Sequence, residues 1–280
     1  MVCYYVDQAG ERFDLRAVRA IGLDEAACKR GHHSVTVFID MARRKRPMLF
    51  VTPGRSKDTL RQFAAFLSEH GGEPGQILEV VCDISPTFLQ GVFERLPNAT
   101  INVDWFHIVQ VFTRSVDDVR KLEGKEKPLP NHLRWALLKR GELDHLTTNQ
   151  LLASASAEIT VQGLNTATAW RLKEKLAWVH KARTPRSSRW RITHFLNWAR
   201  ALLGHTPGLE PMRKALATLK NHIDRVVQRW TSTFTNDRLE GCNGLFLASR
   251  ATGRGYRNTA TFITMIYLIG SPAGSILEST

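Results

Sequence analysis

The sequence predicts a mixed α/β fold that carries a large helical insertion. Two observations support this prediction. Short β-prone runs alternate with amphipathic runs over about the first hundred residues, and positive charge and tryptophan gather in a helical stretch in the middle of the chain. An apolar content of 43% in 280 residues supplies one large core or two modest ones. Disorder, collagen-like repeats and short disulfide scaffolds are therefore excluded.

Three β-prone runs open the predicted sheet, at residues 18–24, 34–40 and 47–52. Glycine, histidine and basic residues separate them, which predicts a three-stranded meander. Next, Ser56 begins an N-cap signal, and an amphipathic run follows that ends at Gly71. These two signals bound one helix.

Two further strands follow, with a helix between them. The strands are expected at residues 77–82 and 100–103, and the helix is opened by Ser85 and Pro86. The resulting order, βββαβαβ, gives a mixed sheet with helices on its faces. This is the arrangement of the ribonuclease-H-like fold.

The middle of the chain carries nearly all of the positive charge. The chain has 39 basic and 26 acidic residues, a formal charge of +13, and 22 basic against 10 acidic residues lie between Arg114 and Trp230. The near neutrality of the rest argues against a general surface bias, although solvated helix faces remain the plain alternative. Such a balance attracts polyanions, so nucleic acid is the leading partner class. We expect core segments at residues 1–112 and 231–280 and a helical basic insertion at 113–230.

The cysteine spacing and the hydropathy of the chain predict its cellular location. No CxxC spacing occurs, so a zinc finger is not encoded and we interpret the cysteines as reduced thiols. No run of 18 apolar residues and no signal peptide is visible. The expected location is the cytoplasm, with no membrane partner. The four cysteines are Cys3, Cys28, Cys82 and Cys242.

Carboxylates at the ends of apolar strands are the main candidates for chemistry. We expect Asp24, Asp83 and Asp104 to close the first, fourth and fifth strands. In a ribonuclease-H-like sheet the first and fourth strands are neighbours, so Asp24 and Asp83 converge. Two such carboxylates repel each other unless a divalent cation bridges them. Two Mg²⁺ ions about 3.5–4 Å apart would then activate a water or a 3′-hydroxyl beside a phosphodiester.

Glu240 is the candidate for a third acid. It lies in what reads as the first turns of a helix beyond the basic stretch. Simpler roles stand beside these assignments: Glu25 or Asp40 as the first acid, Asp83 as a helix cap, and Glu240 as a surface residue favoured near a helix N-terminus.

Together, the motifs around these acids resemble the catalytic region of ISL-three family insertion-sequence transposases, which belong to the DDE superfamily. The resemblance extends from about residue 18 to about residue 265. It rests on IGLDE at 21–25, GH at 31–32, GRSK at 54–57, Asp83, PNA at 97–99, DWFH at 104–107, TN at 235–236, LEG at 239–241, Asn243 and GYRN at 255–258.

The resemblance implies a catalytic triad of Asp24, Asp83 and Glu240 that binds two Mg²⁺ or Mn²⁺ ions. It also implies DNA strand cleavage and strand transfer, with transposon ends and target DNA as partners, a homodimer assembled on DNA, and a nucleoid-associated location. Asp104 and His107 match a D-x-x-H signature that lies near the active site in several transposase groups. His107 is equally well explained as a core histidine bonded to Asp104.

Two groups of residues are candidates for holding DNA. Arginines of the insertion and of the glycine-flanked stretch near residue 255 are suited to phosphate contacts. Tryptophans among basic residues are suited to stacking on bases, although the sequence does not choose among them. The DNA-binding candidates are Arg183, Arg186, Arg189, Arg191, Arg254 and Arg257.

The chain also departs from the family pattern. The family usually carries a zinc-binding and helix-turn-helix region before the first catalytic strand, and about 17 residues precede that strand here. After Asn243 the usual basic run is replaced by the apolar segment 244–249. The alternative function is therefore a truncated, catalytically idle transposase remnant that only binds DNA. A plain nuclease such as a junction resolvase is disfavoured, because it needs no helical insertion of this size.

Overall fold

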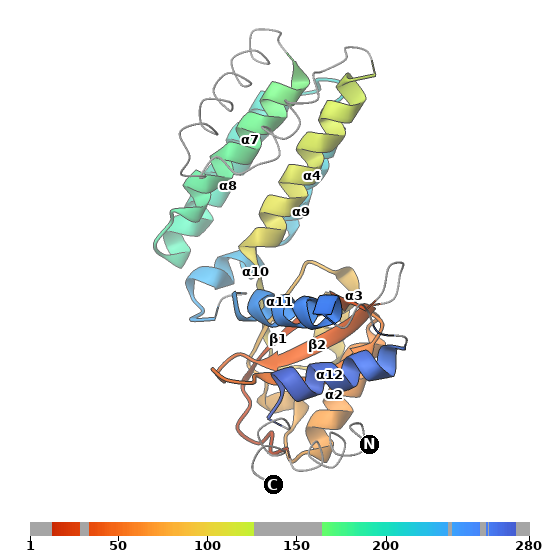
Figure 1. Ribbon diagram of the computed structural model, residues 1–280. Coiled ribbons are helices and arrows are strands. Elements are labelled where there is room, and N and C mark those ends of the chain that lie inside the picture. The colour runs from red at the N-terminus through yellow and green to blue at the C-terminus, as the bar shows by residue number, and fades with distance from the viewer. Residues whose placement is uncertain are drawn as a thin grey trace. The chain divides into compact units, whose positions relative to one another are not determined.

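The computed structural model describes residues 13–28, 34–125, 164–234, 237–252, 256 and 258–272 (Figure 1). The chain forms two compact units: Met1–Asp104 with Ser232–Thr280, and Trp105–Thr231. Arg254, Arg257 and Cys3 lie outside the described residues. No helix of the described ranges is long and apolar enough to cross a membrane.

The first unit is built on a five-stranded mixed sheet in the order β3-β2-β1-β4-β5. β1 pairs antiparallel with β2, and β2 with β3, whereas β1–β4 and β4–β5 are parallel pairs. This confirms the expected meander and the adjacency of the first and fourth strands, and the fold is ribonuclease-H-like. The strands are β1 Ala20–Ala27, β2 Ser34–Asp40, β3 Met48–Pro53, β4 Glu79–Cys82 and β5 Thr100–Val103.

Helices cover both faces of this sheet. Ile21 and Leu23 of β1 pack with α2 and α3, whereas Ala20 and Ala26 of the same strand belong to the cluster under α11 and α12. Alternate residues of a strand point to opposite faces, so even positions of β1 face α11. Figure 1 shows α11 and α12 across one side of β1 and β2. The helices are α2 Asp58–Glu69, η1 Pro74–Gln76, α3 Pro86–Arg95, α11 Asp237–Thr252 and α12 Thr259–Gly270.

One sequence expectation about β1 is wrong. Asp24 does not close the strand, because β1 continues to Ala27 in the antiparallel ladder with β2, in which Asp24 pairs with Val37. The parallel ladder with β4, however, ends at the pair Leu23 and Cys82. Asp24 is therefore the first residue of β1 beyond its partner β4.

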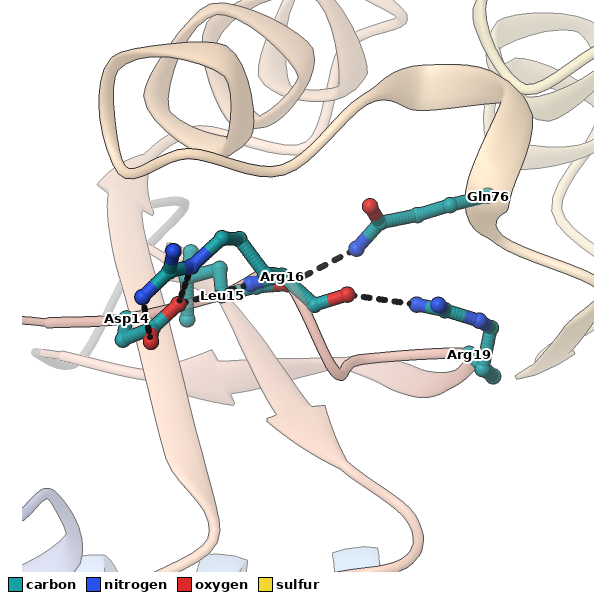
Figure 2. Close-up of polar contacts among 5 residues, drawn as sticks. All are labelled: Asp14, Leu15, Arg16, Arg19 and Gln76. Carbon is teal, nitrogen blue, oxygen red and sulfur yellow. Dashed lines mark hydrogen bonds and ion pairs between the residues drawn. The ribbon is translucent and has the colours of Figure 1, made fainter.

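The segment before β1 is tied to the turn that leads into β4 (Figure 2). Gln76 in η1 donates from Nε2 to the carbonyl oxygen of Leu15 at 2.7 Å. Arg16 binds the Asp14 carboxylate through two side-chain nitrogens at 2.9 and 2.7 Å, and Arg19 donates to the Arg16 carbonyl oxygen at 2.7 Å. The Gln76 bond joins the entries into β1 and β4, and the arginine bonds hold the segment before β1.

In the described part of the second unit, the four longest helices form a ring. α4 packs on α7 and α9, and α8 packs on the same two helices, so each helix has two neighbours. Apolar side chains from all four fill the interior, among them Phe112, Leu172, Phe195 and Leu216. The elements are α4 Trp105–Glu123, α7 Asn165–His180, α8 Pro185–Leu203, α9 Glu210–Asn221, α10 Ile223–Val227 and η2 Gln228–Trp230.

Local signals explain where these helices begin. The Glu123 carboxylate at the end of α4 accepts from the backbone nitrogens of Asn165 and Thr166 at 2.8 and 2.9 Å, and so caps α7. Pro185 starts α8 behind the capping side chain of Thr184, as proline at a first helical position does. The helix α4 runs without a break across residues 112 and 113, the predicted start of the insertion.

Candidate active site

Asp24 and Asp83 lie side by side on neighbouring parallel strands. They directly follow Leu23 and Cys82, the last pair of the β1–β4 ladder. Val81, two residues before Asp83, packs in the cluster under α11, so the alternation of side chains directs Asp83 to the same face as Asp24. Both aspartates are partly exposed. The register thus places the two residues on adjacent strands and on one face, and their role in catalysis stays a prediction.

The helix α11 lies against β1 because Gly22 leaves room for it. A Cβ atom at Gly22 would lie 2.8 Å from Leu239 Cδ1 and 2.7 Å from Met41 Sδ. Leu239, Cys242 and Phe246 form the buried side of α11. A glycine in the strand that carries Asp24 thus allows the helix that carries Glu240 to approach closely.

Polar bonds fix α11 along the length of this contact. Near its start, Arg238 donates to the backbone carbonyl oxygen of Met41. Near its end, Arg250 donates to the carbonyl oxygen of Ala27, the last residue of β1, at 2.6 Å. Between them, Asn243 Nδ2 donates to Asp24 Oδ2 at 2.7 Å. The middle bond is the one that reaches an acid of the predicted site.

The other end of the Asn243 amide is unusual. Its Oδ1 atom is buried and has no hydrogen-bond partner within the described part of the chain. Turning the amide over does not resolve this, because its oxygen would then face the Asp24 carboxylate. Buried polar atoms without partners are rare, and a bound ion or water is one explanation for such an atom. A carboxamide oxygen is also a ligand type that Mg²⁺ and Ca²⁺ accept.

Glu240 lies on α11 one turn before Asn243, and its side chain is exposed. Residues three apart on a helix are neighbours on its surface, so Glu240 and Asn243 share a side of α11. Over the described ranges, no three His, Cys, Asp or Glu side chains lie close enough to hold a metal ion together. The structure therefore places Asp24 and Asp83 together and α11 against β1, and it does not bring Glu240 into a closed group with them.

The donor set suits a hard divalent cation. Asp24, Asp83 and Glu240 offer carboxylate oxygens and Asn243 offers an amide oxygen, whereas sulfur and imidazole are absent from this set. The unpartnered Asn243 oxygen is the observation that best fits a cation or its water at this site.

The two alternatives for the first acid face the other side of the sheet. Glu25 is exposed, next to Asp24, and forms an ion pair with Arg55 at 3.5 Å. Asp40 follows Ile39, which packs under α11, so Asp40 points away from that helix, and its Oδ1 accepts from the backbone nitrogen of Ala42 at 2.9 Å. These placements favour Asp24.

The two residues of the D-x-x-H signature belong to different units: Asp104 to the α/β unit and His107 to the helical unit. Asp104 is 8% exposed and directly follows Val103, which pairs with Cys82, so it continues the row of Asp24 and Asp83. His107 belongs to the first turn of α4 in the helical unit and is partly exposed, with its ring 6.1 Å from that of Phe106.

The candidate DNA-binding arginines differ in their surroundings. Arg183 and Arg186 are exposed at the start of α8 and make no ion pair or hydrogen bond with any described residue. Arg189 pairs with Asp224 at 2.5 Å, and Arg191 donates to the carbonyl oxygen of Trp178 at 2.7 Å. Arg189 and Arg191 therefore hold structure as well as carrying charge, which the sequence did not reveal.

Sequence reasoning included Asn243 in a motif and gave it no role. The available signal was its position three residues after Glu240, because residues at this spacing lie on the same side of a helix. Arg238 and Arg250 were missed altogether, because a bond from a side chain to a distant carbonyl oxygen leaves no local pattern in the sequence.

Comparisons with known proteins agree with this architecture. The family model of ISL-three (ISL3) DDE transposases, described as "Transposase", matches residues 21–266. The transposase of insertion sequence element IS1001 from Bordetella parapertussis is 24% identical over 261 residues, which cover 90% of this chain and 61% of that protein. The transposase of element IS1557 from Mycobacterium tuberculosis (strain CDC 1551 / Oshkosh) is 33% identical over 105 residues, which cover 37% of this chain and 22% of that protein.

A ribonuclease-H-like sheet in which Asp24 and Asp83 directly follow the last pair of two parallel strands defines a class of α/β proteins. Within it, the family match spans most of the chain. The chain belongs to the ISL-three family of DDE transposases of insertion sequences. It spans 61% of the length of its IS1001 relative.

Proposed function

We propose that this chain is the catalytic region of a transposase that cleaves DNA strands and joins them to target DNA with the help of two divalent ions. The observation that carries the proposal is the row of Asp24 and Asp83 at the end of the β1–β4 ladder, with α11 tied to Asp24 through Asn243. Family membership supports the same reaction class.

Asp24, Asp83 and Glu240 are the residues proposed to hold Mg²⁺ or Mn²⁺. When bound, such ions polarise the scissile phosphodiester and activate water or a 3′-hydroxyl. The protein's own contribution is to place the carboxylates: the sheet register sets Asp24 and Asp83, and α11 presents Glu240. Asn243 orients the Asp24 carboxylate by donating to one of its oxygens. The reaction needs no covalent intermediate with the enzyme.

The helical unit is proposed to hold the DNA. Its stretch from Arg114 to Trp230 has an excess of 12 basic residues, and exposed arginines such as Arg186 are suited to phosphate contacts. Phosphate contacts position DNA without reading its sequence, so we expect this chain alone to show little preference for its own transposon ends. Assembly as a homodimer on DNA is part of the proposal.

Strand transfer with the full chain tests this function. The assay joins a pre-cleaved oligonucleotide that ends in the element's terminal repeat to a supercoiled plasmid, with Mg²⁺ or Mn²⁺ present. The variants Asp24→Asn, Asp83→Asn and Glu240→Gln should lose joining and nicking while they still bind DNA. Glu25→Gln is the matched control, because it neutralises the neighbouring acid on the opposite face, and it should remain active.

Two results would contradict the proposal. One is full activity of Asp83→Asn or Glu240→Gln. The other is DNA binding by the unmodified chain with no nicking or joining under any divalent ion, which would support the idle, DNA-binding remnant instead.

A further inference from the structure

One tryptophan of the helical unit is turned to solvent. Trp190, on α8, is 61% exposed, whereas the other described tryptophans are buried or partly buried. The same helix buries Ile192, Phe195 and Leu196 on its other side. The exposed indole ring therefore offers a large flat apolar surface to solvent, and its surroundings decide what that surface fits.

The ring of Trp190 belongs to a small group of aromatic side chains. It stacks on His194, one turn further along α8, with centroids 5.4 Å apart and planes inclined by 18°. Trp178 of α7 meets it edge-on at 6.0 Å. We call Trp178, Trp190 and His194 the aromatic platform. His194 supports one face of the Trp190 ring and so fixes its orientation.

Cations surround the platform. The Lys175 ammonium lies 5.0 Å from the centre of the Trp178 ring, and the Arg191 guanidinium lies 5.2 Å from it. Arg186, one turn before Trp190 on α8, is exposed. Arg191 is held in place by its bond to the Trp178 carbonyl oxygen. The platform is thus a group of mutually packed aromatic rings with positive charge beside it.

Such a surface fits an unpaired nucleotide better than paired DNA. A flat aromatic ring can stack on a base only when that base is not stacked between its neighbours in a duplex. The neighbouring cationic side chains would bind the phosphates. A hydrophobic protein partner would not need the three cationic side chains around the rings.

We propose that the aromatic platform binds unpaired bases of single-stranded or splayed DNA, with Trp190 as the stacking surface and Arg186 as a phosphate contact. The inference takes DNA as the partner from the proposed function. It adds that the helical unit recognises strand separation, a property that phosphate contacts alone do not supply. Stacking is tolerant of sequence, so any base should serve.

The test compares the affinities of a forked duplex and a fully paired duplex of the same length for the full chain. Trp190→Ala should weaken binding of the fork by about tenfold, the lower part of the range for one base on one aromatic ring, and should leave the paired duplex unchanged. Trp190→Phe should keep most of the affinity. Phe93→Ala is the matched control, because Phe93 is 85% exposed in the other unit.

Salt dependence separates stacking from charge. For Trp190→Ala the slope of log affinity against log salt should stay the same, whereas Arg186→Ser should make it shallower. A 2-aminopurine placed at the fork should be quenched by the unmodified chain and by Trp190→Phe, and not by Trp190→Ala. Equal thermal unfolding midpoints show that the variants are folded.

Several results would overturn the inference. These are unchanged fork binding by Trp190→Ala, an equal loss on paired DNA, or a loss of self-association in sedimentation with fork binding intact, which would make the platform a contact between copies of the chain. The test is independent of catalysis. If strand transfer fails and the Trp190 effect holds, the platform stands and only the proposed reaction is lost.

Discussion

Asn243 donates a hydrogen bond from Nδ2 to Asp24 Oδ2 at 2.7 Å, although the two residues are 219 positions apart in the chain. The bond joins the strand that carries the first acid to the helix that carries Glu240. Leu239 of α11 also packs closely on Gly22 of β1. The hydrogen bond and this apolar contact therefore both hold α11 against β1. The two parts of the candidate site thus come from opposite ends of the chain and meet in the α/β unit.

Asn243→Ala should weaken divalent-ion binding and strand joining by about 10- to 100-fold, the usual cost of losing a residue that orients a metal ligand. The physical reason is that Asp24 loses the donor that fixes one of its oxygens. Binding of Mn²⁺ measured by electron paramagnetic resonance gives a readout separate from activity. Asn197→Ala, an exposed asparagine of α8, is the control, and equal Mn²⁺ affinity of the two variants would contradict the role of Asn243.

Gly22→Ala should lower the free energy of unfolding by about 1–3 kcal/mol, because its Cβ would meet Leu239 and Met41 in a packed core. We expect α11 to dock less well. Cys242 reports this: its thiol is 8% exposed and burial raises its pKa, so it should resist alkylation at neutral pH and react faster in Gly22→Ala.

Gly241→Ala provides the matched control for this test. A Cβ at Gly241, on α11 itself, would meet no heavy atom of the described residues within 4 Å. Alanine favours a helix by about 0.5–1 kcal/mol over glycine, so this variant should be at least as stable as the unmodified chain. Slower unfolding of Gly22→Ala than of Gly241→Ala would refute the packing argument.

Asp14 should titrate at an unusually low pH. Its hydrogen bonds from Arg16 lower the pKa of its carboxyl from 3.8 to about 2. A lowered pKa in the folded state stabilises the fold above the unfolded value, and this contribution is lost as the pH falls from about 4 towards 2. Because the pair is exposed, the effect on stability is small. Carboxyl chemical shifts should show the pKa of Asp14 rising towards its ordinary value in Arg16→Ala, in which the backbone nitrogen of residue 16 still donates to Asp14.

The strands and the strand-linked acids could be predicted because their signals are local. In runs such as 34–40 and 100–103, β-prone apolar residues are followed by a polar residue near the strand end. The structure confirms both strands. The end of β1 was misjudged, since the extension to Ala27 depends on pairing with β2, which no short window contains. The role of Asn243 and the partners of Arg189 and Arg191 depend on tertiary contacts in the same way.

Two exposed arginines at and just before the start of α8 are expected to contact DNA phosphates. Replacing Arg183 and Arg186 together by serine should lower DNA affinity and make the slope of log affinity against log salt shallower by about 1.8, close to 0.9 for each lost phosphate contact. Stability should barely change, because neither side chain has a partner among the described residues. Arg191→Ala should instead destabilise the helical unit, since it removes a bond to Trp178 and a cation from its ring. Salt titrations of binding beside thermal melts separate the two effects, and an unchanged slope in the double variant would show that these arginines are only a solvated face.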